Sequence, residues 1–229
     1  MKDTQISKQV SGSGNRTGEK QNEKRKDPAG ETGFYAGIMA GPQFSQTKQQ
    51  GFGGPGLSDG LLVGFHLRRK MAIETGFIIS NKRYVSAGAY FDMSKISASM
   101  PSGMKLSQVQ SKVTVFEIPV KFRYDVLKIN QGNVFTTGGV SSYIITRESN
   151  QYHILNNGYP ETLSGNYSAH QNYFAAAINV SAGYEWKVGK SLNFRVEPYL
   201  QIPTKTIGMG SMHVVSAGLY LGITWAFIK

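Results

Sequence analysis

Charged residues recur at every second position inside segments that otherwise have the composition of apolar β-strands. In 192–202, for example, Arg195 and Glu197 alternate with Phe194 and Val196, which is the side-chain period of a strand. Seven such charges, four acids and three bases, are expected on one side of their strands: Glu74, Glu117, Lys121, Arg123, Glu185, Arg195 and Glu197. Acids and bases enclosed together should pair, because an isolated buried charge costs several kcal/mol. We therefore interpret these residues as a network of ion pairs that closes an interior.

The histidines are the other residues whose chemistry needs weighing. His153 and His170 fall in a segment that we expect to be an external loop, where a lipid-A-modifying enzyme of the outer membrane would keep a His beside a Ser or Asp. His66 and His213 are isolated, with no acid at triad or zinc-ligand spacing. The glycines of 51–56 open no helix, as a phosphate-binding loop would, and the chain has no cysteine. We expect no catalytic residue, no metal and no cofactor.

Period-2 alternation marks the elements that must position the seven charges. It recurs in eight segments: 34–45, 59–68, 71–80, 113–124, 133–146, 174–186, 192–202 and 215–227. In the last, Leu219, Leu221 and Ile223 share one face while Tyr220 and Thr224 share the other. An apolar outer face over a charged inner face is the inverse of a soluble protein and is typical of a membrane β-barrel.

The pattern has exceptions. Segment 133–146 is poorly patterned and its faces are not assigned, and Leu62 and Ile78 fall on the charged side of their segments. Pro119 and Pro198 lie inside segments, although proline cannot donate to a strand ladder. We expect a β-bulge or locally broken pairing at both prolines.

The connections alternate in length, which is a second signal. Four are longer, at 46–58, 81–112, 147–172 and 203–212, and three are shorter, at 69–70, 125–132 and 187–191. Outer-membrane barrels have long external loops and tight periplasmic turns, whereas a Greek-key sandwich has no such rhythm. The sequence therefore predicts an all-β fold, an eight-stranded antiparallel up-and-down transmembrane β-barrel over 34–229, with both termini in the periplasm.

The same strand count bears on function. Eight strands leave an interior that side chains fill, while aqueous porins need about sixteen, and a lipocalin-like soluble barrel would have an apolar lumen. We expect a bacterial outer-membrane protein that acts as a membrane anchor and presents its surface loops for interaction. A small porin-like channel is the alternative, and a lipid-A-modifying enzyme is a further one.

Aromatic side chains collect at the two interfaces of a bilayer. Six are expected in the aromatic girdle near the periplasmic strand ends: Tyr35, Tyr124, Tyr184, Trp186, Trp225 and Phe227. The net charge of +11 does not indicate nucleic acid, because the excess of the barrel lies largely on rims and loops. Acidic lipid and lipopolysaccharide head groups are the expected partners there.

Residues 1–33 differ from the rest of the chain. They hold seven Lys or Arg and five Asp or Glu without apolar periodicity, so we expect a disordered polar tail or linker. They lack the apolar core of a secretory signal. We therefore expect the chain to be a truncated or engineered form, or the downstream part of a longer protein.

Short pieces of the sequence, in their order and spacing, resemble the outer-membrane β-barrel domain found widely in the Bacteroidota, related to the PorT-like barrels. These pieces are F-Y-A-G-I-M-A-G-P at 34–42, E-T-G-F at 74–77, N-K-R-Y at 81–84, E-I-P-V-K at 117–121, S-S-Y at 141–143, N-V-S-A-G-Y-E at 179–185, E-P-Y-L-Q-I-P at 197–203 and the closing G-L-Y-L-G-I-T-W-A-F. The ending, with Tyr220, Gly222, Trp225 and Phe227, is similar to the signal read by the barrel-assembly machinery, although two residues follow it. The resemblance implies an outer-membrane location and a linker role for 1–33 toward a periplasmic or inner-membrane partner.

Overall fold

A computed structural model of the chain describes residues 33–47, 50–94, 103–129, 131–168 and 170–227. This described part is built of β-strands and one 3-10 helix: β1 (Phe34–Thr47), β2 (Gly56–Arg68), β3 (Met71–Ala87), η1 (Gly88–Tyr90), β4 (Met104–Ile129), β5 (Gly132–Asn156), β6 (Tyr159–Tyr167), β7 (Gln171–Lys187), β8 (Leu192–Pro203) and β9 (Val214–Phe227). Within it, no helix has the length and apolar character needed to cross a membrane.

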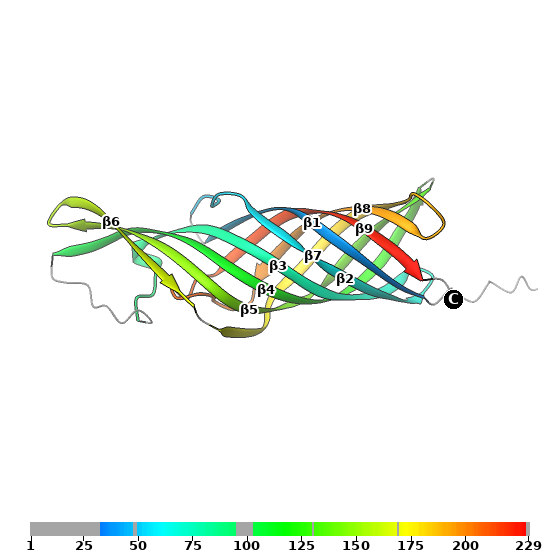
Figure 1. Cartoon of the computed structure of the whole chain (residues 1–229), viewed down its shortest axis with the longest axis horizontal. Coiled ribbons are helices and arrows are strands. Elements are labelled where there is room, and N and C mark those ends of the chain that lie inside the picture. The colour runs from blue at the N-terminus through cyan, green and yellow to red at the C-terminus, as the bar shows by residue number, and fades with distance from the viewer. Residues whose placement is uncertain (1–32, 48–49, 95–102, 130, 169, 228–229) are drawn as a thin grey trace, which may run out of the picture.

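Eight of these strands close into a ring. Each pairs antiparallel with its neighbours in the order β1-β2-β3-β4-β5-β7-β8-β9, and β9 returns to pair with β1. The strands wind obliquely about one long axis (Figure 1), as closure of a sheet requires. The predicted antiparallel eight-stranded ring is confirmed. The ninth strand, β6, was not predicted and pairs with β5 outside the ring.

Alternating faces explain why these segments form a closed barrel. Outward residues such as Leu61, Val120 and Leu221 are apolar and exposed, whereas inward residues such as Ser80 and Glu117 are fully buried. Burying the polar groups is tolerable because the facing walls supply their partners, and exposing the apolar groups is favourable because they meet lipid. The outer wall is therefore an apolar belt.

The predicted long loops at 81–112 and 147–172 are wrong. β3 continues to Ala87, β4 starts at Met104 and β5 runs to Asn156, after which β6 folds back. The two-residue turn Asn157–Gly158 has positive φ at both residues, 48° and 88°, as a tight hairpin needs. Strands that leave the membrane no longer need apolar outward residues, so the contrast between faces fades while the strand continues.

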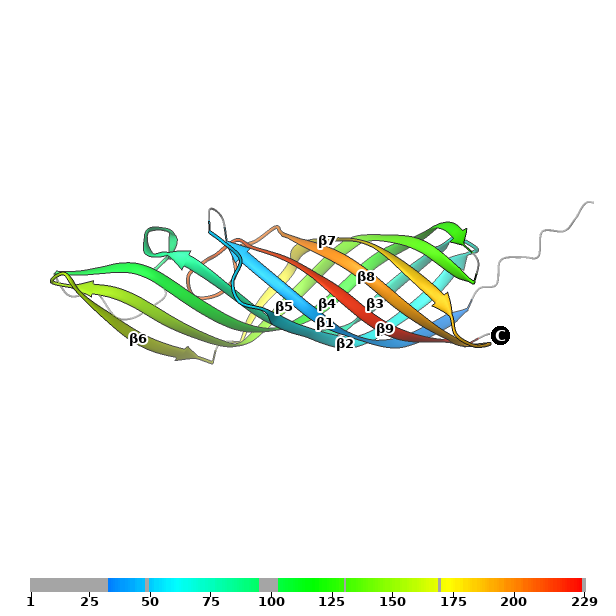
Figure 2. The same cartoon turned by 90° about the horizontal axis from the view of Figure 1, so that it is seen from above.

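These extensions form a sheet beyond the ring that we call the flap, defined as residues 104–114, 147–156 and 159–167. Its strands are paired throughout, β4 with β5 and β5 with β6. Figures 1 and 2 show β6 at one end of the molecule and the chain's C-terminal end at the other. The flap thus projects from the end of the barrel that is remote from the C-terminus.

The faces of β5, which the sequence left unassigned, exchange at one point. The register with β4 shifts between Thr114 and Val115, opposite Arg147 and Ile145, so that Thr146 is the extra residue of a bulge. Before the bulge along the chain, odd-numbered side chains such as Ile145 are buried. After it, even-numbered side chains such as Glu148 are buried. A single alternation cannot describe this strand.

Pro119 and Pro198 break the pairing on one side only. Pro119 pairs regularly with Ser141 of β5, but no pairing with β3 is made between Thr75 and Ile78. Pro198 likewise pairs with β9, while pairing with β7 lapses around it. The register is the same before and after each gap, so the expectation of locally broken pairing is confirmed and no bulge forms at either proline.

Candidate functional site in the barrel interior

The structure places all seven predicted charges inside the barrel, where six form one connected network and Glu117 pairs separately with Lys82. Each is between 0% and 9% exposed, and they project from β3, β4, β7 and β8. Three further charges lie with or above them and were not predicted: Lys82, Asp125 and Glu148. Lys82 and Glu148 fall in what the sequence suggested were loops, and Asp125 in a predicted turn.

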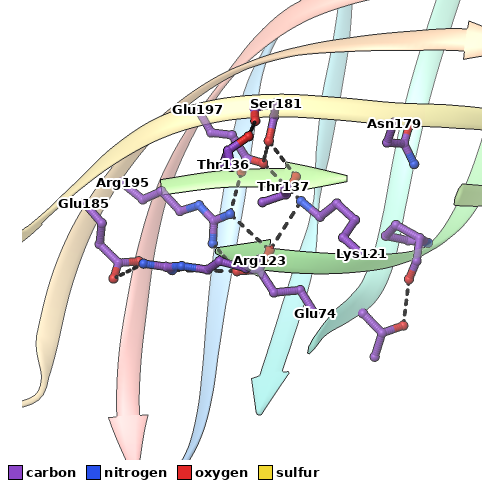
Figure 3. A network of polar contacts seen from close by, with 12 residues as sticks. Glu74, Lys121, Arg123, Thr136, Thr137, Asn179, Ser181, Glu185, Arg195 and Glu197 are labelled. Atoms are coloured by element: carbon purple, nitrogen blue, oxygen red, sulfur yellow. Dashed lines mark hydrogen bonds and ion pairs between the residues drawn. The ribbon is translucent and has the colours of Figure 1, made fainter. Parts of the chain in front are cut away.

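Glu74 lies at the centre of this network (Figure 3). Arg195 donates two hydrogen bonds to its carboxylate, from Nη1 to Oε1 at 2.7 Å and from Nη2 to Oε2 at 3.1 Å. Lys121 Nζ lies 3.5 Å from Glu74 Oε2 and 3.1 Å from Glu197 Oε1. Arg195 Nη2 also lies 2.9 Å from Glu197 Oε2. Two acids and two bases thus neutralise one another by direct contact.

Arg123 forms a second centre beside the first. Its Nη1 and Nη2 donate to Glu185 at 3.0 and 3.1 Å, and its Nε donates to Asp125 Oδ1 at 2.8 Å. The same guanidinium lies 3.7 Å from Glu74 Oε1, which links the two centres. Bidentate Arg–carboxylate pairs of this kind are strong and directional, so the two guanidinium planes are fixed.

The ring of Phe135 lies close to both guanidinium groups. Its ring centroid is 4.3 Å from Arg123 Cζ and 4.2 Å from Arg195 Cζ. The negative faces of an aromatic ring attract cations, most strongly where water is excluded. An aromatic residue inside the barrel therefore helps to hold two like charges close together.

Tyr35 corrects one prediction. We expected it in the interfacial girdle, but its side chain is buried in the interior and its hydroxyl donates to Glu74 Oε1 at 2.7 Å. The neighbouring strand makes room for the ring, because a Cβ added at Gly64 would overlap it. The hydroxyl of Tyr35 donates a hydrogen bond to a buried carboxylate. This bond stabilises the inward position of the side chain more than contact with the bilayer interface would stabilise an outward one.

The other five girdle residues lie on or near the outer surface. Tyr124, Trp186, Trp225 and Phe227 are 37%, 37%, 42% and 61% exposed, and Tyr184 is half-buried with its ring 5.0 Å from that of Trp186. All five lie toward the ends of β4, β7 and β9. Their place on the outer wall at strand ends is the one that an interfacial girdle needs.

A second ion pair stands further along the barrel. Lys82 Nζ lies 3.0 Å from Glu117 Oε1, and Glu117 also accepts hydrogen bonds from Ser80 at 2.5 Å and Gln201 at 2.8 Å. Between this pair and the Glu74 centre, the rings of Tyr199 and Tyr220 stack with centroids 4.2 Å apart. Leu62 and Ile78, the two apolar residues on the charged face, pack in the same cluster.

A small cavity lies beside the Glu74 centre. This cavity of about 20 Å³ is lined by polar side chains that include Lys121, Asn179 and Glu197, which is room for about one water molecule. Asn179 Oδ1 is buried there without a hydrogen-bond partner. A single bound water would satisfy it.

An apolar layer closes the end of the barrel under the flap. Its buried members come from β3, β4, β5, β7, β9, Phe91 after η1 and the segment 204–213, and include Val109, Ile145, Ile207 and Met212. The segment 204–213 is tied down by polar contacts as well, since Met209 N donates to Glu148 Oε2 at 2.8 Å and Asp92 N donates to Gly210 O at 3.2 Å. The members that fall in predicted loops, such as Val109, Ile207 and Met212, are scattered apolar residues in the sequence.

The histidines form no reactive cluster in the described part of the chain. His153 lies in β5, with Nδ1 3.1 Å from Thr162 Oγ1, and His170 is exposed between β6 and β7. Among the residues that the structure describes, no group of three His, Asp or Glu is arranged to hold a metal ion.

Comparisons with known proteins agree with the barrel architecture. The family described as "Outer membrane protein beta-barrel domain" matches residues 20–202. Neisserial surface protein A (NspA) is similar in structure, with a TM-score of 0.52 and 12% identity over 86% of this chain and 99% of that one. At this identity the likeness supports the fold alone.

Two further solved structures are more distant. Ail, the attachment invasion locus protein of Yersinia pestis, is 8% identical over 87% of this chain and 99% of that one, with a TM-score of 0.43. The outer membrane protein OprG from Pseudomonas aeruginosa is 10% identical over 88% of this chain and 99% of that one, with a TM-score of 0.43. No curated protein sequence matches the chain.

Proposed function

The chain belongs to the outer membrane protein β-barrel domain family and lies in the bacterial outer membrane, and we propose that it works there as a closed anchor that presents the flap to partners outside the membrane. On this proposal the barrel neither conducts solutes nor catalyses a reaction. Within the family we assign it to the PorT-like barrels of the Bacteroidota, on the pieces of sequence given above.

The observation that carries this proposal is that the interior is filled at successive levels. The Glu74 and Arg123 centres occupy one level, the Lys82–Glu117 pair a second and the apolar layer around Ile207 a third. A permeation path would need the charges to face water, whereas these charges are paired with one another. The small cavity beside Lys121 holds about one water and is no channel.

The flap is the part of the molecule suited to contact a partner. Its strands are continuous with the ring strands β4 and β5 past the bulge at Thr146, so the barrel fixes its orientation. Its last strand, β6, pairs with β5 and leaves its other edge unpaired among the described residues. Exposed Tyr159 and Leu163 lie on this strand. Aromatic and aliphatic side chains on a rigid edge strand are suited to recognise an extended segment of a partner.

The orientation follows the general rule that barrel termini and short turns are periplasmic. It places the flap outside the cell and the aromatic residues at the ends of β4, β7 and β9 near the periplasm. Residues 1–32 lie outside the described part. We propose that residues 1–33 link the barrel to a periplasmic or inner-membrane partner, and that the closing strand is read by the barrel-assembly machinery.

Planar-bilayer recording tests the closed state. The refolded chain should insert without producing single-channel steps at either polarity, while a sixteen-stranded porin in the same bilayer gives steps and serves as the positive control. Stable steps from the wild-type chain, enlarged by Glu117→Ala, would establish the channel alternative in place of a closed anchor.

A further inference from the structure

Three basic side chains gather on the outer wall of the barrel at the base of the flap. Arg83 of β3 is directly opposite Lys112 of β4 in the register, and both are exposed. Arg147 of β5, also exposed, is opposite Thr114, so it is the diagonal neighbour of Lys112. We call these three residues the basic triad. Its members come from three adjacent strands and share one face.

This arrangement is unfavourable by itself. Side chains directly opposite on antiparallel strands have Cβ atoms about 5 Å apart, where like charges destabilise the pair. Across the described ranges, none of the three makes an ion pair. The outward acid of the neighbouring strand, Asp59, is opposite Ile79, four residues before Arg83. The wall therefore carries a cluster of positive charge that the protein itself does not balance.

The position of the basic triad relative to the apolar belt indicates which group neutralises its charge. On the same strands the apolar belt ends with Ile79 opposite Phe116, and the next outward pair is polar, with Thr114 Oγ1 donating to Asn81 Oδ1 at 3.1 Å. Arg83 and Lys112 are the next outward pair, four residues and so roughly 13 Å along the strands from Ile79 and Phe116, which a strand tilt of about 40° shortens to about 10 Å along the membrane normal. The head-group layer begins at the edge of the hydrocarbon and is about 5–8 Å deep on each side of a bilayer, so this pair lies at its outer edge and the long side chains reach back into it.

We propose that the basic triad binds the phosphate groups of outer-leaflet lipid, and so fixes the base of the flap to the membrane surface. The proposal rests on the orientation given under the proposed function. Arginine suits this role because its guanidinium forms bidentate hydrogen bonds with phosphate, and the long side chains of all three residues reach along the wall while their stems stay over apolar surface.

Binding of bisphosphorylated lipid A to the full refolded chain in zwitterionic detergent tests the site. The triple variant Arg83→Gln, Lys112→Gln, Arg147→Gln should bind this lipid at least about tenfold more weakly at about 0.1 M salt, because each basic residue beside an anionic membrane surface is worth about fivefold in affinity. The matched control removes the same charge from the opposite rim by Arg68→Gln, Arg69→Gln and Lys70→Gln. It should change affinity less than about twofold, since charges beyond a Debye length are screened.

An equal loss in both variants, or none in the triad variant, overturns the proposal. Heat-modified mobility on gels checks that both variants are folded. Since the measurement is made in detergent, its result does not depend on whether the barrel conducts, so failure of this site and failure of the closed anchor are separable.

Two further probes separate the sources of the phosphate. Lipid A stripped of its phosphates should bind the wild-type chain as weakly as the phosphorylated lipid binds the triad variant. Equal binding of the stripped and phosphorylated lipids overturns the proposal. Inorganic phosphate should displace the lipid only at large excess. Complete displacement at equal concentration identifies a site for free anions and overturns the assignment to lipid.

Discussion

Arg195 and Glu74 join opposite walls of the barrel. They lie on β8 and β3, which are four strands apart in either direction round the ring, and two hydrogen bonds of 2.7 and 3.1 Å connect them. The strands paired with β3 are β2 and β4, so Arg195 does not reach Glu74 from an adjacent strand. The pair therefore forms only when the ring is closed, and it ties the stability of the charged interior to closure.

Replacing Glu74 by Ala should lower the free energy of unfolding by about 3–5 kcal/mol, because it leaves the buried Arg195 without its main partner. Urea unfolding of the refolded chain in lipid vesicles measures this loss. The control Leu221→Ala removes an outward side chain that is 45% exposed. It should cost about 1 kcal/mol, since fluid lipid leaves no fixed cavity. The reverse order of the two losses would contradict a charged interior held by pairing.

Replacing Ile207 by Ala should loosen the apolar layer under the flap while the ring stays folded. Ile207 is 2% exposed and packs in the cluster that includes Val109 and Met212, so the cavity should cost about 2–4 kcal/mol locally. Hydrogen exchange should quicken in 204–213 and remain unchanged in β1 and β9. Uniform quickening over the whole ring would show instead that this segment is part of the global unfolding unit.

Gly53 and Gly51 lie in the same connection and should respond differently to Ala. A Cβ at Gly53 would overlap the carbonyl oxygen of Arg83, whereas nothing lies within 4 Å of a Cβ at Gly51. We expect Gly53→Ala to destabilise the folded chain by about 1–3 kcal/mol and Gly51→Ala to change it by less than about 1 kcal/mol. Melting by circular dichroism compares the two. Similar melting points would mean that the connection moves aside without cost.

Cysteines placed at Ser164 in β6 and at Gly189 between β7 and β8 test the orientation. The chain has no cysteine of its own, so labelling is specific. A membrane-impermeant maleimide added to intact cells should label the first site and leave the second unlabelled until the outer membrane is opened. Labelling of Gly189→Cys alone would place the flap in the periplasm.

Local alternation was enough to predict which side of a regular strand faces inward. Glu117, Lys121 and Arg123 share their parity on β4, and all three are buried. Pairing of each strand with its sequence neighbours then follows from short turns. Partners such as Arg195 for Glu74 could not be predicted, because they depend on how far the ring staggers and which walls face each other across it.

Three residues show that two signals in the sequence give different information. The odd or even position of a residue in its strand indicates which face it is on, whereas the contrast between apolar and polar faces indicates which part of the strand lies in the membrane. Tyr35 was placed by its distance from the strand end, although it shares parity with the inward Met39. Lys82 keeps the parity of Glu74, but lies past the point where outward residues cease to be apolar. Glu148 follows the bulge at Thr146, which changes the parity of all that comes after it. The position of a bulge and the position of a residue along the membrane normal depend on the assembled sheet, so local alternation does not predict them.

The charges of β4 also matter before the barrel exists. Glu117, Lys121 and Arg123 stand within seven consecutive residues, and each would cost about 2.5–3.5 kcal/mol or somewhat less at the centre of a membrane helix. A translocating segment with such a pattern is not retained in the inner membrane, even though half of its residues are apolar. The charged side chains that form ion pairs in the folded barrel thus allow the unfolded chain to cross the inner membrane on its way to the outer membrane.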